Sequence, residues 1–359
     1  MRIAVTGASG FCGGVVARAA AAAGAEVVCL GRRPGPVGEH RYWDATRTEP
    51  DLTGTDIVLH LAAAVGDPPP GRASEATFHA VNVDGTARLL DAAGDRPLVW
   101  VSSASVYAPP FPAPGTATTP PTPPTGSANT RPSRTNVGPG ARPSRTTVGP
   151  GARPSRTTMG PGARPSRTTM EPGARPSPKP ITEDHPLAGM TAYGRTKAAG
   201  ERLARQAGAV ILRPRAVYGP GDPHLLPRLK RVVRAGRALL PGPDIALSLT
   251  AVENLADACL AAHGWPAGAY NIADAIPYRR DEVVAAVCGV PVLHIPIPLV
   301  SAVSGLAVGA ARLTRRPPIL TRYALEQLTT GVVLDISRAR SQGWTPHRTL
   351  HDFLPSPAP

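Results

Sequence analysis

Two side chains, Tyr193 and Lys197, have the types and the spacing that proton exchange with an alcohol requires. They are four residues apart in Tyr-Gly-Arg-Thr-Lys, and residues at that spacing on a helix lie one turn apart on the same face. A phenol is a poor base because its pKa is about 10, but a nearby ammonium group favours the phenolate near neutral pH. The same spacing also suits a structural tyrosine that anchors the helix, followed by a solvated lysine. The surrounding sequence must therefore distinguish the catalytic interpretation from the structural one.

The amino-terminal stretch has the pattern of a dinucleotide-binding turn. Ile3–Thr6 is a short apolar run typical of a buried parallel strand, Gly7, Gly10 and Gly13 follow it, and an alanine-rich helix is predicted over residues 14–23. Glycines allow a tight turn and let backbone N–H groups approach a pyrophosphate at the positive end of a helix. The spacing is G-x-x-G-x-x-G, and its place between a strand and a helix makes it a dinucleotide signal.

Two arginines follow the second predicted strand, residues 26–30. An NAD-specific site usually places an acidic residue here to bind the ribose 2′-hydroxyl, whereas this chain has Arg32 and Arg33. Arginine matches a 2′-phosphate in charge and geometry, so we predict that NADP is favoured over NAD. The alternative is that both arginines lie on a surface loop and do not contact the cofactor. Asp44 ends a third predicted strand, where it could contact the adenine.

Two further predicted strands, residues 56–63 and 97–103, continue an alternation of strands and helices. Small residues at the end of the first leave room for a cofactor, while His60 is expected to be structural because its neighbours are apolar. Ser103 stands at the carboxyl end of the second, where open α/β sheets bind ligands. The alternation predicts an α/β fold, a Rossmann-type doubly wound parallel sheet with a smaller carboxyl-terminal substrate lobe.

These motifs together resemble the extended short-chain dehydrogenase/reductase family, of the NAD-dependent epimerase/dehydratase type. The resemblance covers nearly the whole chain outside residues 109–180, and the carboxyl-terminal part is similar to the 3β-hydroxysteroid dehydrogenase-like branch. The matching motifs, in chain order, are Thr6–Gly13, His60–Ala63, Asn82 with Gly85 and Thr86, Ser103–Tyr107, Tyr193 with Lys197, and Arg213–Pro220.

The resemblance implies a role for each residue of the candidate site. Tyr193 would be the acid or base, Lys197 its electrostatic partner and a ribose ligand, and Ser103 a hydroxyl that polarises the carbonyl. Family members place this serine four residues before the tyrosine of the Val-Tyr pair, which selects Ser103 over Ser102 and Ser105. Cofactor contacts are expected from Gly7, Ser9, Gly10, Phe11, Gly13, Arg32, Arg33, Asp44, Leu61, Ala62, Ala63, Asn82, Tyr193, Lys197 and Pro214.

Residues 109–180 are foreign to that family. Arg-Pro-Ser-Arg-Thr begins at Arg131, Arg142, Arg153 and Arg164, a period of eleven residues. Each unit holds proline and glycine with almost no apolar side chain, so we predict a long disordered insertion, partly polyproline-II. Near-identity of the copies favours tandem duplication without a function. A tether to anionic surfaces or a set of phosphorylation sites is the alternative.

The net charge of +14 belongs mainly to that segment. Residues 109–180 carry nine Arg and one Lys against one Glu, whereas the remainder carries 29 basic and 24 acidic residues. No aromatic residue interleaves with the repeated arginines, so no specific binding of nucleic acid is expected.

Four cysteines, Cys12, Cys29, Cys259 and Cys288, lack Cys-x-x-Cys spacing. They are expected to be small buried hydrophobes in a reducing compartment, with neither a disulfide framework nor a metal site. The chain starts directly with a strand pattern, so no signal peptide is expected and the predicted location is the cytoplasm.

The second half is expected to complete the Rossmann domain and to form the substrate lobe, with a helix over residues 224–240. Residues 292–311 are notably apolar, but their unbroken part, 299–311, is shorter than the roughly 20 residues of a membrane span. We expect it to line the substrate pocket rather than to lie at a membrane interface. The predicted NAD(P)-binding domain is 1–108 and 181–212, with 244–265 returning to it; the insertion is 109–180; the substrate lobe is 213–243 and 266–359.

These expectations favour an enzyme that transfers hydride between a nicotinamide and a secondary alcohol or ketone carbon of a small apolar or alicyclic substrate. A nucleotide-sugar epimerase of the same family is the first alternative, and a noncatalytic cofactor-binding scaffold or sensor is the second. A 4,6-dehydratase is disfavoured, because such family members carry Asp-Glu where this chain has Ala104 and Ser105. The expected partner is a small-molecule substrate, and a homodimer is compatible with the resemblance.

Overall fold

The computed structural model describes residues 1–66, 72–109, 179–223, 225–230, 232–298 and 331–354. The chain divides into two units, of which Met1–Phe111 and Ser177–Pro359 form the first and Pro112–Pro176 the second. The second unit, and with it nearly all of the predicted insertion, lies outside the described residues, as does the apolar stretch 299–311.

The first unit is built on a parallel sheet of seven strands in the order β3-β2-β1-β4-β5-β6-β12. The chain moves outward from β1 to β3 and then crosses to the other side of β1 at β4, so β1 and β4 flank a topological switch point. This architecture confirms the predicted Rossmann-type fold. The strands are β1 (Arg2–Thr6), β2 (Glu26–Gly31), β3 (Glu39–Tyr42), β4 (Ile57–His60), β5 (Leu98–Val101), β6 (Val210–Pro214) and β12 (Gly268–Ile272).

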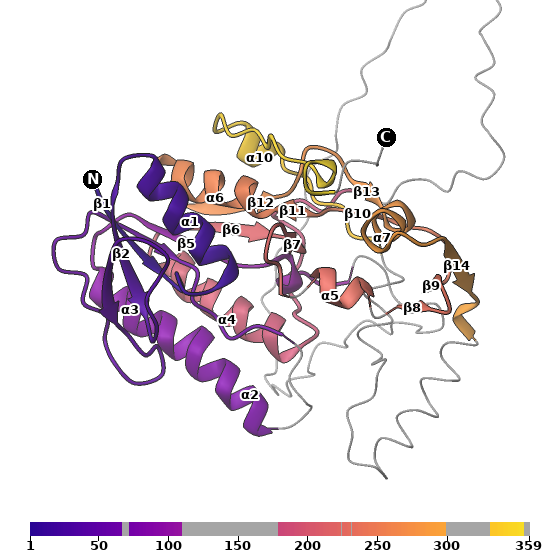
Figure 1. Ribbon diagram of the computed structural model, residues 1–359. Coiled ribbons are helices and arrows are strands. Elements are labelled where there is room, and N and C mark those ends of the chain that lie inside the picture. Colours follow the sequence, from indigo (N-terminus) through magenta and orange to yellow (C-terminus); the bar gives the residue numbers. More distant parts are fainter. Residues whose placement is uncertain (67–71, 110–178, 224, 231, 299–330, 355–359) are drawn as a thin grey trace, which may run out of the picture. The chain divides into compact units, whose positions relative to one another are not determined.

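Helices cover both faces of the sheet and make a three-layer arrangement (Figure 1). One face carries α1 (Phe11–Ala22) and α6 (Val252–Ala261). The short α10 (Ser337–Arg340) packs against the same hydrophobic core. The other face carries α3 (Gly85–Ala93) and α4 (Ala192–Gln206), preceded by α2 (Arg72–His79) and a π-helical turn, η1 (Ala80–Asp84).

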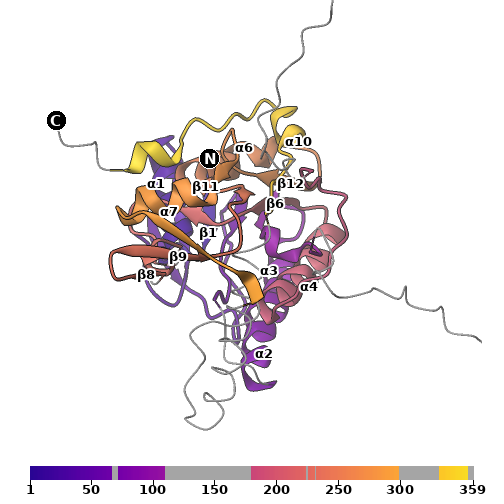
Figure 2. The same ribbon diagram turned by 90° about the vertical axis from the view of Figure 1, so that its right-hand side faces the viewer.

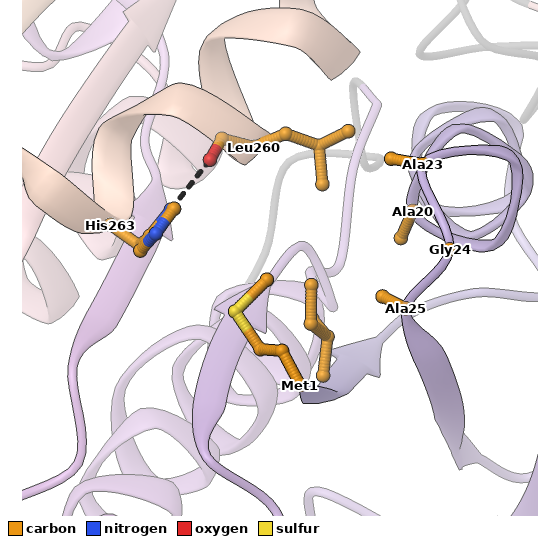
Figure 3. A pocket seen from close by; sticks show the side chains of 8 residues that line it. Met1, Ala20, Ala23, Gly24, Ala25, Leu260 and His263 are labelled. Carbon is orange, nitrogen blue, oxygen red and sulfur yellow. Dashed lines mark hydrogen bonds between the residues drawn. The ribbon is translucent and has the colours of Figure 1, made fainter.

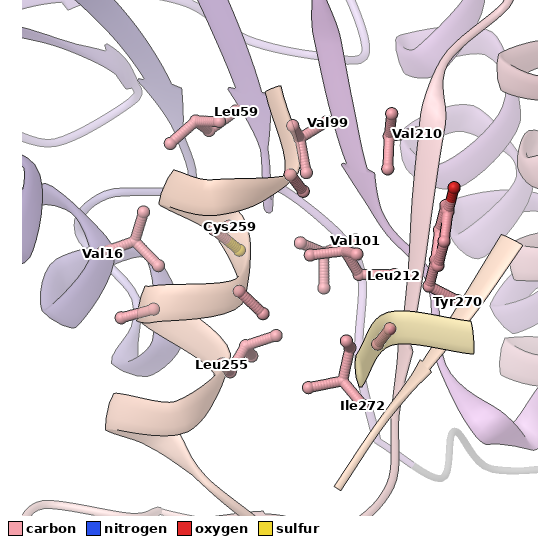
Figure 4. Packing of buried hydrophobic residues seen from close by; sticks show 14 of the residues in the cluster. Val16, Leu59, Val99, Val101, Val210, Leu212, Leu255, Cys259, Tyr270 and Ile272 are labelled. Atoms are coloured by element: carbon pink, nitrogen blue, oxygen red, sulfur yellow. The ribbon is translucent and has the colours of Figure 1, made fainter. Parts of the chain in front are cut away.

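Strand side chains alternate between the two helical layers, as the pleat of a strand requires. Val99 and Val101 of β5 belong to the core under α1 and α6, which Figure 4 shows with Leu255 and Cys259 of α6. Trp100, between them, belongs to the core under α3 and α4. Both faces of the sheet are therefore dry, which explains why its strands are near-continuous apolar runs.

The prediction of one helix over 224–240 is wrong in its second half. The helix there, α5 (Leu225–Lys230), is short, and a hairpin of β8 (Val233–Arg234) and β9 (Arg237–Pro241) follows. Ala235 and Gly236, with φ values of +46° and +71°, form its two-residue turn, a backbone that suits the twist of a hairpin. β9 pairs in parallel with β14 (Val292–Ile295). The two strands lie side by side at the right of Figure 1, the side that Figure 2 turns towards the viewer.

A third hydrophobic cluster lies in this second part of the unit, with Tyr218, Leu240 and Tyr278 among its buried members. Short paired strands and α7 (Arg280–Cys288) surround it. The paired strands are β7 (Val217–Tyr218) with β11 (Thr250–Ala251), and β10 (Ala246–Leu247) with β13 (Tyr278–Arg279).

The chain on the two sides of the intervening stretch 110–178 meets again in the described structure. Tyr107 pairs with Leu187 in an antiparallel bridge. The N–H of Ala108 donates to the Pro186 carbonyl at 2.8 Å, and His185 Nε2 lies 3.2 Å from the Ala108 carbonyl oxygen. The described residues on the two sides of this stretch, 107–108 and 185–187, are therefore held together by backbone and side-chain contacts.

Among the helices that the structure describes, none has both the length and the apolar character needed to cross a membrane.

Candidate active site

Helix α4 carries both residues of the proposed proton-transfer pair. Its first turn is capped by Thr191, whose side-chain oxygen accepts the Gly194 N–H at 3.0 Å, and such a cap satisfies a backbone donor that the helix itself cannot. Tyr193 follows in this first turn and packs its ring edge-to-face with Phe78 of α2, with centroids 6.5 Å apart. The expected placement of Tyr193 and Lys197 one turn apart on a helix is confirmed.

Lys197 is buried, with 2% of its surface exposed. Its Nζ donates to the Val101 carbonyl at 2.6 Å and lies 3.7 Å from the centroid of the Trp100 ring. Burial lowers the pKa of Lys197 to about 7, although the negative charge of Glu201 acts in the opposite direction. An ammonium group held this way has a free energy of protonation that responds strongly to nearby charge.

Ser103 begins a short turn of 3₁₀ helix that ends at Val106, and the segment Ser103–Tyr107 is called the serine turn below. The Ser103 Oγ accepts the N–H of Ser105 at 3.2 Å and its hydroxyl at 3.0 Å, so the Ser103 proton can be donated elsewhere. Ser102, by contrast, is buried and donates its hydroxyl to a carboxylate, that of Glu201. This geometry agrees with choosing Ser103 over its neighbours.

The serine turn and the start of α4 are in backbone contact. A Cβ added at Gly194 would lie 2.5 Å from the Ser105 carbonyl oxygen, so a larger residue could not occupy that position without displacing one of the two segments. Gly194 directly follows Tyr193, and Ser105 closely follows Ser103. The fold thus brings the two segments that carry the candidate hydroxyls together.

The segment Gly7–Gly13, called the glycine turn below, lies against the end of β4 at the switch point of the sheet. Gly7 has a φ of +71°, and a Cβ there would lie 2.8 Å from the Ala62 N atom. A Cβ at Gly13 would lie 2.2 Å from the Gly7 carbonyl oxygen. The Thr6 Oγ1 completes the junction by accepting the N–H groups of Leu61 and Ala62 at 3.1 and 3.0 Å.

The amino terminus of α1 opens on a groove of about 440 Å³. Gly10 is the N-cap, no side chain caps the first turn, and the first turn holds no acidic residue. Its N–H groups and the positive end of the helix dipole therefore suit an anion such as a dinucleotide pyrophosphate. The groove is lined by residues of the turn, of α1 and of two loops: Ala8, Ser9, Gly10, Phe11, Gly14, Arg18, Pro34, Gly35, Pro36, Pro220, Gly221 and Pro223.

One arginine lines this groove, and two more precede Pro34, which also lines it. Arg32 and Arg33 follow β2 and are exposed, and Arg18 lines the groove itself. Arg18 was missed by the sequence reasoning, although it is the only basic residue of α1. Hydrogen bonds from Thr46 lower the pKa of Asp44 below its ordinary value, and the charge of Arg32 acts in the same direction.

Asn82 and Pro214, two of the expected cofactor contacts, are both buried. Asn82 Oδ1 accepts the Ala64 N–H at 2.8 Å, and its Nδ2 donates to the Ala64 carbonyl at 3.1 Å and to the Thr196 Oγ1 at 3.0 Å. This amide therefore ties the segment after β4, which includes Ala63, to α4. Pro214 is the last residue of β6 and is buried.

His60 is buried between two tryptophans and bonds to Thr6, with Nδ1 2.8 Å from Oγ1. Because the Thr6 oxygen already accepts two N–H groups, its proton is directed to His60 Nδ1, which assigns the ring proton to Nε2. Burial, together with the charge of Lys197, lowers the pKa of His60 to about 3. A neutral His60 in a packed core matches the structural role that was expected.

A second hollow, of about 260 Å³, lies at the opposite edge of the sheet, where the strands begin (Figure 3). It lies beside Leu260 and His263, and His263 Nδ1 is 2.6 Å from the Leu260 carbonyl oxygen. No group of three or more His, Cys, Asp or Glu side chains able to hold a metal ion occurs among the residues that the structure describes. The expected site residues Ser103 and Gly7–Gly13 follow the carboxyl ends of β5 and β1 instead.

The family model described as NAD dependent epimerase/dehydratase family matches residues 3–130 and 166–273, more than half of the chain. The chain belongs to this family. The match covers the glycine turn, the serine turn and α4, and it agrees with the resemblance to the extended short-chain dehydrogenase/reductases.

Two curated relatives carry the name 2-alkyl-3-oxoalkanoate reductase. The one from Shewanella oneidensis is 30% identical over 190 residues, which cover 45% of this chain and 49% of the relative. The one from Stenotrophomonas maltophilia is 31% identical over 207 residues, 47% of this chain and 62% of the relative. In each case the chain thus matches less than two thirds of the relative's length.

Solved structures share the fold along nearly the whole chain. The UDP-glucuronic acid 4-epimerase from Bacillus cereus, solved in complex with NAD, is 17% identical and superposes with a TM-score of 0.58, covering 98% of this chain and 94% of that one. At this identity the likeness shows the fold alone.

Proposed function

We propose that the protein is an NADP-dependent oxidoreductase that interconverts a secondary alcohol and a ketone on a small, largely apolar substrate. The observation that carries this proposal is α4, which presents Tyr193 one turn from a buried Lys197 and starts in contact with the serine turn. The groove at the amino terminus of α1 supports the proposal, because its backbone N–H groups suit the pyrophosphate of a dinucleotide.

In this proposal Tyr193 removes or returns the proton of the substrate hydroxyl at its Oη. Lys197 stabilises the phenolate through its positive charge, and Ser103 donates a hydrogen bond to the substrate oxygen. The nicotinamide cofactor, when bound, supplies or accepts the hydride. Neutral His60 and Trp100 exclude water from the far side of Lys197, which strengthens its electrostatic effect.

The residues of the groove fit a dinucleotide and favour a 2′-phosphate. The glycine turn and the amino terminus of α1 would hold the pyrophosphate, while Arg32 and Arg33 would hold the 2′-phosphate of NADP. Neither arginine is hydrogen-bonded to a described residue, so both guanidinium groups are available. We expect NADP to bind at least tenfold more tightly than NAD, and Arg32→Ala with Arg33→Ala to remove the difference. Tighter binding of NAD by the unaltered protein would contradict this preference.

The substrate class follows from the relatives' printed name. A 2-alkyl-3-oxoalkanoate is a 3-oxo carboxylate whose ketone is flanked by the alkylated C2 and an alkyl chain, so apart from its carboxylate it agrees with the apolar substrate expected from the composition of the carboxyl-terminal part. We therefore propose a 3-oxoacid or related ketone with alkyl substituents. A nucleotide-sugar epimerase is the second candidate, and the family description and the epimerase that shares the fold favour it.

Oxidation of NADPH, followed at 340 nm against a panel of 3-oxoacids, cyclic ketones and UDP-sugars, tests the proposal. Turnover of a ketone with kcat lowered by about 10²–10⁴ in Tyr193→Phe is the expected result. Interconversion of UDP-sugars without net oxidation would select the epimerase. If the protein binds NADP and acts on neither class, or if Tyr193→Phe retains full turnover, the proposed function is wrong and a noncatalytic cofactor-binding role replaces it.

A further inference from the structure

The serine turn is anchored at both ends by one buried ion pair. At the amino side, the Ser102 hydroxyl donates to Glu201 Oε2 at 2.7 Å. At the carboxyl side, Arg213 Nη1 donates to the Tyr107 hydroxyl oxygen at 2.9 Å, and the guanidinium lies 4.9 Å from the centroid of that ring. The segment with the candidate Ser103 is thus clamped between α4 and β6.

The pair itself is fully enclosed. Glu201 and Arg213 each have 1% of their side-chain surface exposed, and they are joined by two hydrogen bonds, one of them from Nε to Oε2 at 3.1 Å. Burial alone would raise the pKa of Glu201, but the hydrogen bonds and the charge of Arg213 outweigh it and lower that pKa. A buried ion pair is weak evidence for stability, because desolvation can cancel its Coulomb energy.

The same glutamate lies one helical turn beyond Lys197. Lys197, which bonds to the Val101 carbonyl, and Glu201, which bonds to the Ser102 hydroxyl, therefore hold consecutive residues at the end of β5. The backbone of Ser102 is fixed from the other side, since its N–H donates to the Leu212 carbonyl at 2.7 Å. The end of β5 cannot move relative to α4 without breaking these bonds.

We propose that Glu201 and Arg213 are positioning residues for the reaction, which hold Ser103 at a fixed place relative to Tyr193. This inference rests on the proposed function and deepens it, because it names the groups that set the geometry of the serine and the tyrosine. Neither residue needs to touch substrate or cofactor. Glu201 has a second effect, because its charge supports the protonated form of Lys197.

The clamp can be loosened without unpairing the buried charges. Ser102→Ala removes the hydrogen bond at one end. Tyr107→Phe removes the one at the other end, together with the bond from the Tyr107 hydroxyl to Asn271 Oδ1, and keeps the ring beside Arg213. Arg205→Ala is the matched control, because the half-exposed Arg205 contacts Glu201 Oε1 at 3.3 Å but does not touch the serine turn. We expect each clamp variant to lower kcat by about tenfold or more, with KM and the Kd of NADPH nearly unchanged, since small misplacement of a catalytic group is costly.

A readout that needs no substrate separates this inference from the proposed function. Hydrogen exchange of the Ser105, Val106 and Tyr107 amides, whose acceptors lie within the serine turn, should accelerate in Ser102→Ala and not in Arg205→Ala. Unchanged exchange overturns the clamp, whether or not a substrate has been found. A loss confined to KM, or equal losses in the control, also overturns it.

The pH profile of Glu201→Gln tests the second effect. Among the described residues, Glu201 acts on Lys197 by its charge, Tyr193 lies one turn before Lys197 in α4, and His60 from β4 is neutral near pH 7. Removing the Glu201 charge should lower the pKa of Lys197 further. The alkaline limb of the kcat profile should then move to lower pH, while Arg205→Ala leaves it in place. A limb that stays or moves to higher pH contradicts this effect.

Discussion

The two edges of the large sheet are filled by opposite kinds of residue. At the carboxyl edge, charged and polar side chains such as Lys197, Glu201 and Arg213 are buried and bonded to one another or to backbone. At the amino edge, the hollow beside α1 is lined mainly by Met1, Leu260 and small apolar residues (Figure 3).

The difference teaches that a hollow by itself does not mark function. Buried polar groups cost free energy unless they are paired. A cluster of such groups is therefore a better indication of a functional site than an apolar hollow. The amino-edge hollow contains few groups that could orient a ligand. Substitutions at the two edges should therefore act on different properties, activity at one edge and stability at the other.

The largest expected effect is on turnover at the carboxyl edge. Ser103→Ala removes the hydroxyl that is proposed to bond to the substrate oxygen, and kcat should fall by about 10²–10³, the usual loss for one such donor. The Kd of NADPH, measured by fluorescence, should not change. Equal turnover in the variant would remove Ser103 from the mechanism.

A pair of glycine substitutions sharpens the contrast. Gly13→Ala places a Cβ 2.2 Å from the Gly7 carbonyl oxygen, so the turn must shift, and NADPH binding should weaken by roughly 100-fold. Gly24→Ala at the amino edge meets nothing within 4 Å but must adopt a φ of +82°. It should cost about 1 kcal/mol of unfolding free energy and leave the Kd of NADPH unchanged. The reverse pattern would refute the division between the edges.

Lys197→Met should remove one source of the dependence of stability on pH. The pKa of Lys197 is about 7 in the folded chain, below its ordinary value of about 10.4 in an unfolded one. Between these values the unfolded state binds more protons, so this group makes the native protein more stable as pH rises. Relative to wild type, the inactive variant should be most stabilised below pH 7, and its advantage should shrink by a few kcal/mol towards pH 10. Urea unfolding at several pH values measures this, and a constant difference would contradict it.

The smallest effect is expected inside the amino-edge hollow. Ala23→Leu adds apolar volume beside Leu260 (Figure 3), so the free energy of unfolding should change by no more than about 0.5 kcal/mol and kcat should not change. A marked loss of turnover would show that this edge communicates with the site.

Much of the fold could be predicted because local pattern and tertiary environment agree. The apolar strands, the glycine turn and the Tyr193–Lys197 spacing all depend on near neighbours in the chain. The hairpin of β8 and β9 was missed because β9 depends on pairing with β14, about fifty residues later, and because Ala235 is an unusual residue for a turn with positive φ.

The clamp could not be predicted for a similar reason. Glu201 is one of several charged residues in α4, and its partner Arg213 lies on a different element. Two signals were nevertheless present. Glu201 is eight residues after Tyr193, on the same helical face, and Arg213 ends an apolar run in which an unpaired charge would be unfavourable.

The bridge between Tyr107 and Leu187 has a consequence for how this chain can vary in length. Because the backbone is pinned on both sides, the span between these residues can shorten or lengthen without altering the register of any strand in the sheet. The entropy of closing such a span changes by only about 0.6 kcal/mol for each doubling of its length. Duplication or loss of repeats there should therefore change the free energy of folding only slightly. A version lacking residues 115–178 should fold with the same bridge between Tyr107 and Leu187.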